Sequence, residues 1–175
     1  MIKIESAGIT DIGRKRAGNE DSFFIDDGSY LYIVADGMGG HNAGEVASKI
    51  VVDTVKRMMG QYTGGNTDKI KSIQDASIHA TWLVSSILEA NRLVYGFSRK
   101  ESSYEGMGST IAAVFLTSDT LIASNVGDSP IYLIRNNDIN LLSVPHTAMA
   151  EYAAFAPAGA PPLSEKFRHT ITRAV

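Results

Sequence analysis

The order of apolar patterns along this chain predicts an α+β fold with antiparallel sheets. Residues 22–26 and 30–35 are apolar runs on either side of an Asp-Gly turn, an arrangement typical of a β-hairpin. Two stretches with apolar residues at helical spacing follow, and four short apolar runs separated by turns come after them. A hairpin, a pair of helices and a series of consecutive strands together indicate helices that cover the face of a sheet.

The chain begins with weak apolar alternation over residues 2–10, which predicts an outer strand. A polar loop, residues 11–21, follows and carries three basic residues before the acids Glu20 and Asp21. A solvated turn explains this charge pattern most simply. A more specific interpretation is that Arg16 offers its planar guanidinium to a phosphate, while Glu20 and Asp21 face a cation or hold its waters.

A strand, a glycine-rich turn and a helix follow one another in the next stretch. The apolar run of residues 31–35 ends at Asp36, and Gly37 and further glycines precede a helical pattern that begins at Ala43. A carboxylate at the end of a buried strand is a hard oxygen ligand held in a fixed place. Gly37, which has no Cβ, lets its own carbonyl approach the same point. The stretch therefore predicts half of a divalent-metal site, and the hairpin brings Asp21 close to Asp36.

The glycine-rich turn has two other interpretations. A phosphate-binding loop also joins a strand to a helix through glycines, but it needs a Gly-Lys-Ser/Thr ending, and this sequence has Gly-Gly-His-Asn. The charge of Asp36 would also repel a phosphate. An ordinary glycine turn with a capping acid is the commoner explanation of a lone Asp-Gly pair. The metal-site interpretation therefore depends on acids elsewhere in the chain.

Two helices are expected in the middle of the chain. Apolar residues at helical spacing span residues 43–59, and Gly60 is expected to end that helix. After a loop, Thr67 or Asp68 is a candidate cap for a longer helix whose apolar stripe runs over residues 73–97. This stripe is narrow and rich in alanine, which suits close antiparallel packing against the first helix.

The four strands that follow predict an antiparallel meander. They are expected at residues 110–116, 120–126, 130–135 and 139–142, with short polar turns between them. Asp128 comes directly after an apolar strand and Gly127. Asp36 likewise stands beside a glycine at the end of an apolar run. A second carboxylate at a strand end makes a site more plausible than an isolated turn.

The bulk properties exclude several classes of protein. The chain has 175 residues, which suits a single domain, and a net charge of −3 that argues against nucleic acid or an anionic membrane as a partner. It contains no cysteine, so disulfides, thiolate metal sites and cysteine nucleophiles are excluded. No apolar run approaches membrane-spanning length. We expect a soluble, cytoplasmic protein.

Four stretches, GRKRAGNEDSF, YIVADGMGGHNAGEVAS, GMGSTIAAVF and ASNVGDSPIYLIR, carry a resemblance to a known family. In this order they resemble the N-terminal part of a bacterial PP2C-type (PPM family) metal-dependent serine/threonine protein phosphatase. The resemblance implies that residues 1–175 form one domain, a sandwich of two antiparallel sheets flanked by helices. Within residues 145–175, Pro157, Pro161 and Pro162 suggest a flap-like loop between two short helical pieces.

The resemblance further implies two or more Mn²⁺ or Mg²⁺ ions, which carboxylate and carbonyl oxygens favour. By matching motifs, Asp36 would bridge two of the ions and Gly37 would give its carbonyl to one. Glu20 and Asp21 would hold metal-bound waters, and Asp128 would serve a further ion. The implied reaction is the hydrolysis of phosphoserine and phosphothreonine in proteins by a metal-activated water.

Arg16 would bind the substrate phosphate, and the substrates would be phosphorylated proteins, the targets of serine/threonine kinases. Some members of the family have a general-acid histidine where this sequence has Met38. His41 is near that position and is a candidate for proton transfer, although a histidine at the start of a helix is commonly structural. Neither nucleic acid nor membrane is expected as a partner.

The sequence departs from the family pattern at three places. Pro130 stands where arginine is usual, and the acid that usually precedes the position of His146 is missing. The chain also ends before the later Asp-Gly and Asp-Asn segments of the family, so we expect weak metal binding and poor hydrolysis by these 175 residues. A phosphatase-like fragment or pseudoenzyme that binds or regulates a phosphoprotein partner therefore stays open as the alternative. Unpaired strand edges would also favour a homodimer.

Overall fold

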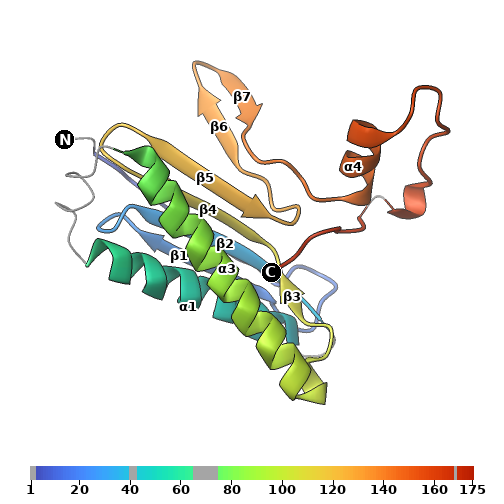
Figure 1. Cartoon of the computed structure of the whole chain (residues 1–175), viewed down its shortest axis with the longest axis horizontal. Helices are drawn as coiled ribbons and strands as arrows, with labels where there is room; N and C mark the ends of the chain where they lie inside the picture. The colour runs from blue at the N-terminus through green and yellow to red at the C-terminus, as the bar shows by residue number, and fades with distance from the viewer. Residues whose placement is uncertain (1–2, 40–42, 65–74, 168) are drawn as a thin grey trace.

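The computed structural model describes residues 3–39, 43–64, 75–167 and 169–175. Its centre is a five-stranded antiparallel sheet in the order β1-β2-β4-β5, with β3 paired to β2. Helices α1 (Ala43–Thr63) and α3 (Ala76–Lys100) run side by side across this sheet (Figure 1). A separate two-stranded sheet and a C-terminal segment lie beyond β5 (Figure 1). The predicted class of antiparallel sheets with helices is confirmed.

The first hairpin forms as predicted, and it sets the register of the candidate acids. Strands β1 (Asp21–Asp26) and β2 (Leu31–Met38) pair antiparallel, with Asp21 opposite Asp36. The prediction that the strand ends at Asp36 is wrong, because β2 continues to Met38. It continues because Gly37 and Met38 pair with the short strand β3 (Gly108–Ser109).

The two helices differ from their predicted limits. Helix α1 passes through Gly60 and ends at Thr63, followed by Gly64 with a φ of +64°. Gly60 does not stop the helix because burying Met59 and Thr63 outweighs the modest cost of one glycine. The predicted caps Thr67 and Asp68 lie outside the described residues. Asp75 caps α3 instead, and its side chain accepts a hydrogen bond from the amide of Ser77 at 2.9 Å.

The hydrophobic core lies between one face of the sheet and the two helices. Alternate residues of β2 and of β4 (Ile111–Leu116) point to this face, as the period of a strand requires. The two helices supply the other half of the core with apolar residues at helical spacing. The largest fully buried apolar side chains are Phe115, Leu31, Ile33, Met59, Leu83, Ile111, Val51, Val55 and Val94.

The predicted meander is divided between two sheets. Strand β5 (Leu121–Val126) pairs with β4 as expected, but β6 (Tyr132–Arg135) and β7 (Asp138–Leu141) form a separate hairpin. The chain leaves the first sheet at Gly127, whose φ is +96°, and Pro130 follows. The left-handed backbone conformation of Gly127 and the missing amide hydrogen of Pro130 interrupt the backbone hydrogen bonds of the first sheet, so the next strand does not extend that sheet.

The predicted N-terminal strand is absent, since residues 3–10 are irregular. Side chains tie this segment to the hairpin: Ser6 Oγ donates to Asp27 Oδ1 at 2.6 Å, and Thr10 Oγ1 donates to Asp21 Oδ2 at 3.0 Å. Without a backbone ladder to join, weak apolar alternation does not produce a strand.

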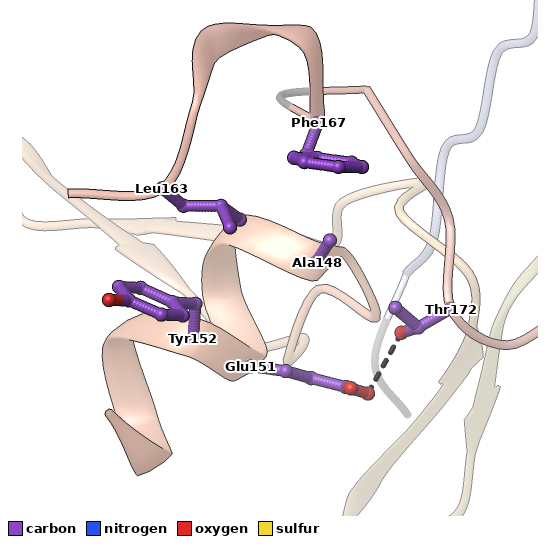
Figure 2. A pocket seen from close by; sticks show the side chains of 6 residues that line it. All are labelled: Ala148, Glu151, Tyr152, Leu163, Phe167 and Thr172. Carbon is purple, nitrogen blue, oxygen red and sulfur yellow. Dashed lines mark hydrogen bonds between the residues drawn. The ribbon is translucent and has the colours of Figure 1, made fainter. Parts of the chain in front are cut away.

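The C-terminal segment contains helix α4 (Ala148–Phe155) and the short 3₁₀ helix η2 (Glu165–Phe167). A pocket of about 360 Å³ lies between them, and a hydrogen bond of 2.8 Å from Thr172 to Glu151 closes one side (Figure 2). The end of the chain returns to the sheet, where Val175 and Ser109 exchange backbone hydrogen bonds of 2.9 and 3.0 Å. Within the part of the chain described, no helix is long and apolar enough to cross a bilayer.

Candidate metal and phosphate site

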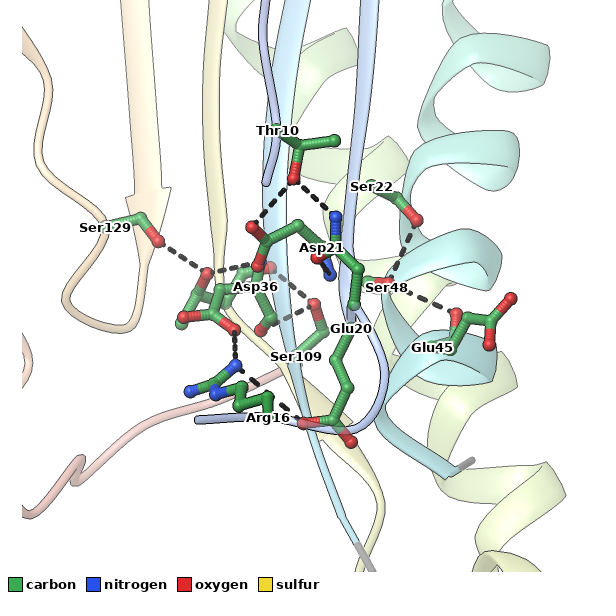
Figure 3. Close-up of polar contacts among 12 residues, drawn as sticks. Thr10, Arg16, Glu20, Asp21, Ser22, Asp36, Glu45, Ser48, Ser109 and Ser129 are labelled. Carbon is green, nitrogen blue, oxygen red and sulfur yellow. Dashed lines mark hydrogen bonds and ion pairs between the residues drawn. The ribbon is translucent and has the colours of Figure 1, made fainter. Parts of the chain in front are cut away.

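The hairpin places Asp21 and Asp36 side by side at one end of the sheet, as predicted (Figure 3). Directly paired residues project from the same face, so both carboxylates lie on the face opposite the helices. Burial raises the pKa of Asp36 above its ordinary value, and the charge of Asp21 and a hydrogen bond with it raise that pKa further. The neighbouring guanidinium of Arg16 acts in the opposite direction.

Arg16 lies between two acids. Its Nη1 is 4.0 Å from Oδ1 of Asp36 and 3.9 Å from Oε2 of Glu20 (Figure 3). The Arg16 side chain is 59% exposed, so solvent screens these long ion pairs and they hold it weakly. The exposed guanidinium of Arg16 can therefore leave these acids and bind the oxygens of a phosphate group.

Gly37 and Gly44 allow the strand, the polar loop and helix α1 to meet closely. The amide of Gly37 donates to the carbonyl of Glu20 at 3.0 Å, and a Cβ on Gly37 would overlap the backbone of Gly44. A Cβ on Gly44 would stand 2.5 Å from Oε1 of Glu20. Glu20 is therefore held against the first turn of α1, a favourable place for an acid. The role of the Gly37 carbonyl as a metal ligand stays a prediction.

Asp128 lies on the loop after β5 and approaches from a different part of the chain. Its charge also raises the pKa of Asp36, which places the two carboxylates within electrostatic reach of each other. The role of Asp128 as a metal ligand stays a prediction. His41, the candidate for proton transfer, lies outside the described residues.

Several hydroxyl and amide groups around these acids were missed by the sequence analysis. The side chain of Asn19 donates to Thr10 at 2.8 Å and accepts from the amide of Asp21 at 3.1 Å. Thr110 Oγ1 accepts from the amide of Asp36 at 3.0 Å and lies 2.7 Å from Ser129 Oγ. The sequence signal for Thr110 is its place in the stretch GMGSTIAAVF, two residues after Gly108.

The donor set suits a hard divalent cation. Carboxylate oxygens are what Mg²⁺ and Mn²⁺ prefer. The pKa of Asp36 is raised by burial and then by the charge of Asp21, and a bound cation would oppose both effects. Among the described residues, no three histidine, cysteine, aspartate or glutamate side chains are close enough to surround one ion. The side chains present thus supply part of a coordination shell, which water and carbonyl oxygens would have to complete.

Comparison with known proteins gives consistent relatives. A serine/threonine phosphatase of Listeria welshimeri is 35% identical over 145 residues, which cover 81% of this chain and 54% of that protein. The serine/threonine protein phosphatase PstP of Mycobacterium tuberculosis is 33% identical over 142 residues, or 81% of this chain and 25% of that protein. The chain therefore spans about half the length, or less, of these relatives.

Solved structures of such phosphatases share the fold. A serine/threonine phosphatase from Staphylococcus aureus matches with a TM-score of 0.75 and 28% identity, covering 95% of this chain and 63% of that one. The catalytic domain of PstP in complex with two manganese ions matches with a TM-score of 0.71 and 29% identity, covering 93% and 62%. The sequence profile of the protein phosphatase 2C family matches residues 13–171. The chain belongs to the protein phosphatase 2C family.

Proposed function

We propose that the protein to which this chain belongs removes phosphate from phosphoserine and phosphothreonine in other proteins, with the help of divalent cations. The observation that carries the proposal is the direct pairing of Asp21 with Asp36 on neighbouring strands, with the guanidinium of Arg16 beside Asp36. Burial and the charge of Asp21 raise the pKa of Asp36, so a counter-charge would stabilise its ionised form, and a phosphate group needs cations. The membership of the phosphatase 2C family supports the same reaction.

In this proposal each residue has a separate task. Asp36 bridges the cations, and Gly37 contributes its carbonyl oxygen. Glu20 and Asp21 hold waters at the same end of the sheet, because both are fixed by the hairpin and the loop before it. Arg16 binds two oxygens of the phosphate through its guanidinium.

The proposed cations are Mn²⁺ or Mg²⁺, two or more, with Asp128 serving the loosest of them. The manganese complex of the similar mycobacterial phosphatase domain supports this choice, as do the oxygen donors. When bound, such cations lower the pKa of water and neutralise the developing charge on a phosphoryl group.

Several finer features stay predictions. We expect substrates phosphorylated by serine/threonine kinases and a location in the cytoplasm. The flap-like role of residues 145–175 is supported by helix α4, which lies away from the five-stranded sheet (Figure 1), while the chain end at Val175 returns to that sheet. Homodimer formation is supported by the hairpin β6–β7, where exposed apolar side chains share one face. They are Tyr132, Ile134, Ile139 and Leu141.

The test is phosphate release from a phosphothreonine peptide by the full-length product of the gene. We expect turnover with Mn²⁺ or Mg²⁺, none with a chelator, and a loss of at least about a hundredfold in kcat for Asp36→Asn and Arg16→Ala. Asp53→Asn, an exposed acid on α1, is the matched control and should keep full activity. Retained activity in Asp36→Asn would refute the role of Asp36.

A second function is favoured by one observation, the absence of three metal-ligating side chains around a common point in the described residues. The chain would then bind a phosphoprotein without hydrolysing it. Binding of the phosphothreonine peptide by this 175-residue chain, without Mn²⁺-dependent phosphate release, would favour this alternative. Phosphate release by the same chain would exclude it.

A further inference from the structure

The loop that carries Asp128 is packed directly against Thr110. It comprises residues 127–129 and follows β5. Gly127 has a φ of +96°, and a Cβ there would stand 2.7 Å from Cγ2 and 2.8 Å from Cβ of Thr110. Only a glycine fits both the backbone conformation and the space. Thr110 is 1% exposed, so it cannot move aside to accommodate a different loop conformation.

The Thr110 hydroxyl joins this loop to the strand that carries Asp36. Its Oγ1 accepts the amide hydrogen of Asp36 at 3.0 Å and lies 2.7 Å from the hydroxyl oxygen of Ser129. The amide of Thr110 also donates to the carbonyl of Asp36 at 2.8 Å. The buried Thr110 side chain thus contacts the backbone of Asp36 and the side chain of Ser129, the neighbour of Asp128.

His146 holds the opposite side of the same loop. The amide of Gly127 donates to Nδ1 of His146 at 3.1 Å, and the amide of His146 donates to the carbonyl of Gly127 at 2.9 Å. These reciprocal bonds require an unprotonated Nδ1. The amide of Thr172 donates in turn to the carbonyl of His146 at 2.9 Å, which attaches the C-terminal segment to this point.

We propose that Thr110 and His146 are positioning residues that together fix Asp128 relative to Asp36. The inference rests on the proposed function, in which Asp36 and Asp128 bind divalent cations. Carboxylates that share a set of cations must be held within about 0.5 Å of their working positions. Residues that hold ligands in this way commonly change metal affinity by about 10- to 100-fold when they are removed.

The imidazole of His146 is not needed to keep the surrounding chain together. The side chain of Asn125 already bonds both the carbonyl of Val144, at 2.8 Å, and its amide, at 3.3 Å. Ser143 Oγ accepts from the amide of Ile131 at 2.9 Å. Removing the ring should therefore release Gly127 locally, while the chain on either side stays paired.

The first test needs no metal. A hydrogen bond between two nitrogens transmits a scalar coupling, so NMR of the metal-free ¹⁵N-labelled chain should detect a coupling between the amide nitrogen of Gly127 and Nδ1 of His146. Thr110→Val should weaken this coupling and speed the exchange of the Gly127 amide hydrogen, because the loop loses the hydrogen bond between Ser129 and Thr110. A metal-free spectrum without the coupling would overturn the inference.

The second test measures Mn²⁺ affinity by calorimetry. His146→Ala and Thr110→Val should each weaken binding about tenfold. His146→Asn, whose amide oxygen can replace Nδ1 as acceptor, and Thr110→Ser should stay near the wild-type value. Thr63→Val is the matched control for a simple loss of stability. Thr63 is buried, and its hydroxyl donates to the carbonyls of Met59 and Gly60 within α1.

The outcomes separate this inference from the proposed function. Equal losses in His146→Ala and His146→Asn would overturn the role of the acceptor. Unchanged affinity in His146→Ala, together with a loss in Asp36→Asn, would overturn the positioning role and leave the proposed function standing. Unchanged affinity in Asp36→Asn would instead contradict the proposed function.

Discussion

Substituting Gly37 by alanine tests how closely the site is packed. The new Cβ would overlap the carbonyl of Gly44 and stand 2.7 Å from the carbonyl oxygen of Glu20. Both obstacles are backbone, so strand β2 and helix α1 must separate. Overpacking of this kind costs about 1–3 kcal/mol, and we expect the upper end because no flexible side chain can yield. For a chain of this size, a loss of about 3 kcal/mol lowers the thermal midpoint by about 6–12 °C.

Gly60→Ala is the matched control, because it adds the same methyl group on helix α1, where a Cβ meets no obstruction. No atom lies within 4 Å of a Cβ built on Gly60, which is exposed inside α1. Alanine there should stabilise the fold by about 0.5–1 kcal/mol through helix propensity. Urea denaturation of both variants measures the difference. A Gly37→Ala variant as stable as the wild type would refute the argument from close packing.

Two further predictions concern pH. Burial lowers the pKa of His79, which is 0% exposed and whose ring nitrogens find no hydrogen-bond partner among the described residues. The unfolded chain therefore binds the proton of His79 more readily than the folded chain does. Stability should therefore fall as the pH drops through about 6.5, and His79→Leu should reduce this loss in denaturation curves at pH 7 and 5; an unchanged slope would contradict it. Asp36 has a raised pKa, so its charged form destabilises the metal-free fold, and Asp36→Asn should be more stable than wild type at pH 7. That gain should shrink as the pH falls through the raised pKa of Asp36 and should vanish below about 4, where the carboxyl is protonated in the folded and the unfolded chain alike. A variant less stable than the wild type at pH 7 would argue against the raised pKa.

Local patterns predicted the part of the site that depends on a hairpin. The Asp-Gly turn and the flanking apolar runs were sufficient to place Asp21 opposite Asp36, because a short turn fixes the register of both strands. They did not predict that β2 continues to Met38, because its partner β3 comes about 70 residues later in the chain.

The remaining differences come from long-range packing. The turns after β4 and β5 have similar polar residues, yet only the second contains Gly127, whose positive φ takes the chain out of the sheet. Glycine has a low helix propensity, but the burial of Met59 and Thr63 on either side of Gly60 stabilises α1 as far as Thr63. Thr110 looks like an ordinary strand residue, and its role depends on contacts with residues 36 and 129 that no local pattern records.

The central claim is that Asp36 holds divalent cations at the end of the sheet, and calorimetric titration with Mn²⁺ tests it most directly. The wild-type chain and the control Asp53→Asn should bind with the same affinity, since Asp53 is exposed on α1. Asp36→Asn should bind at least about tenfold more weakly, because a neutral amide cannot bridge two cations. Equal Mn²⁺ affinities for the wild type and Asp36→Asn would contradict the claim.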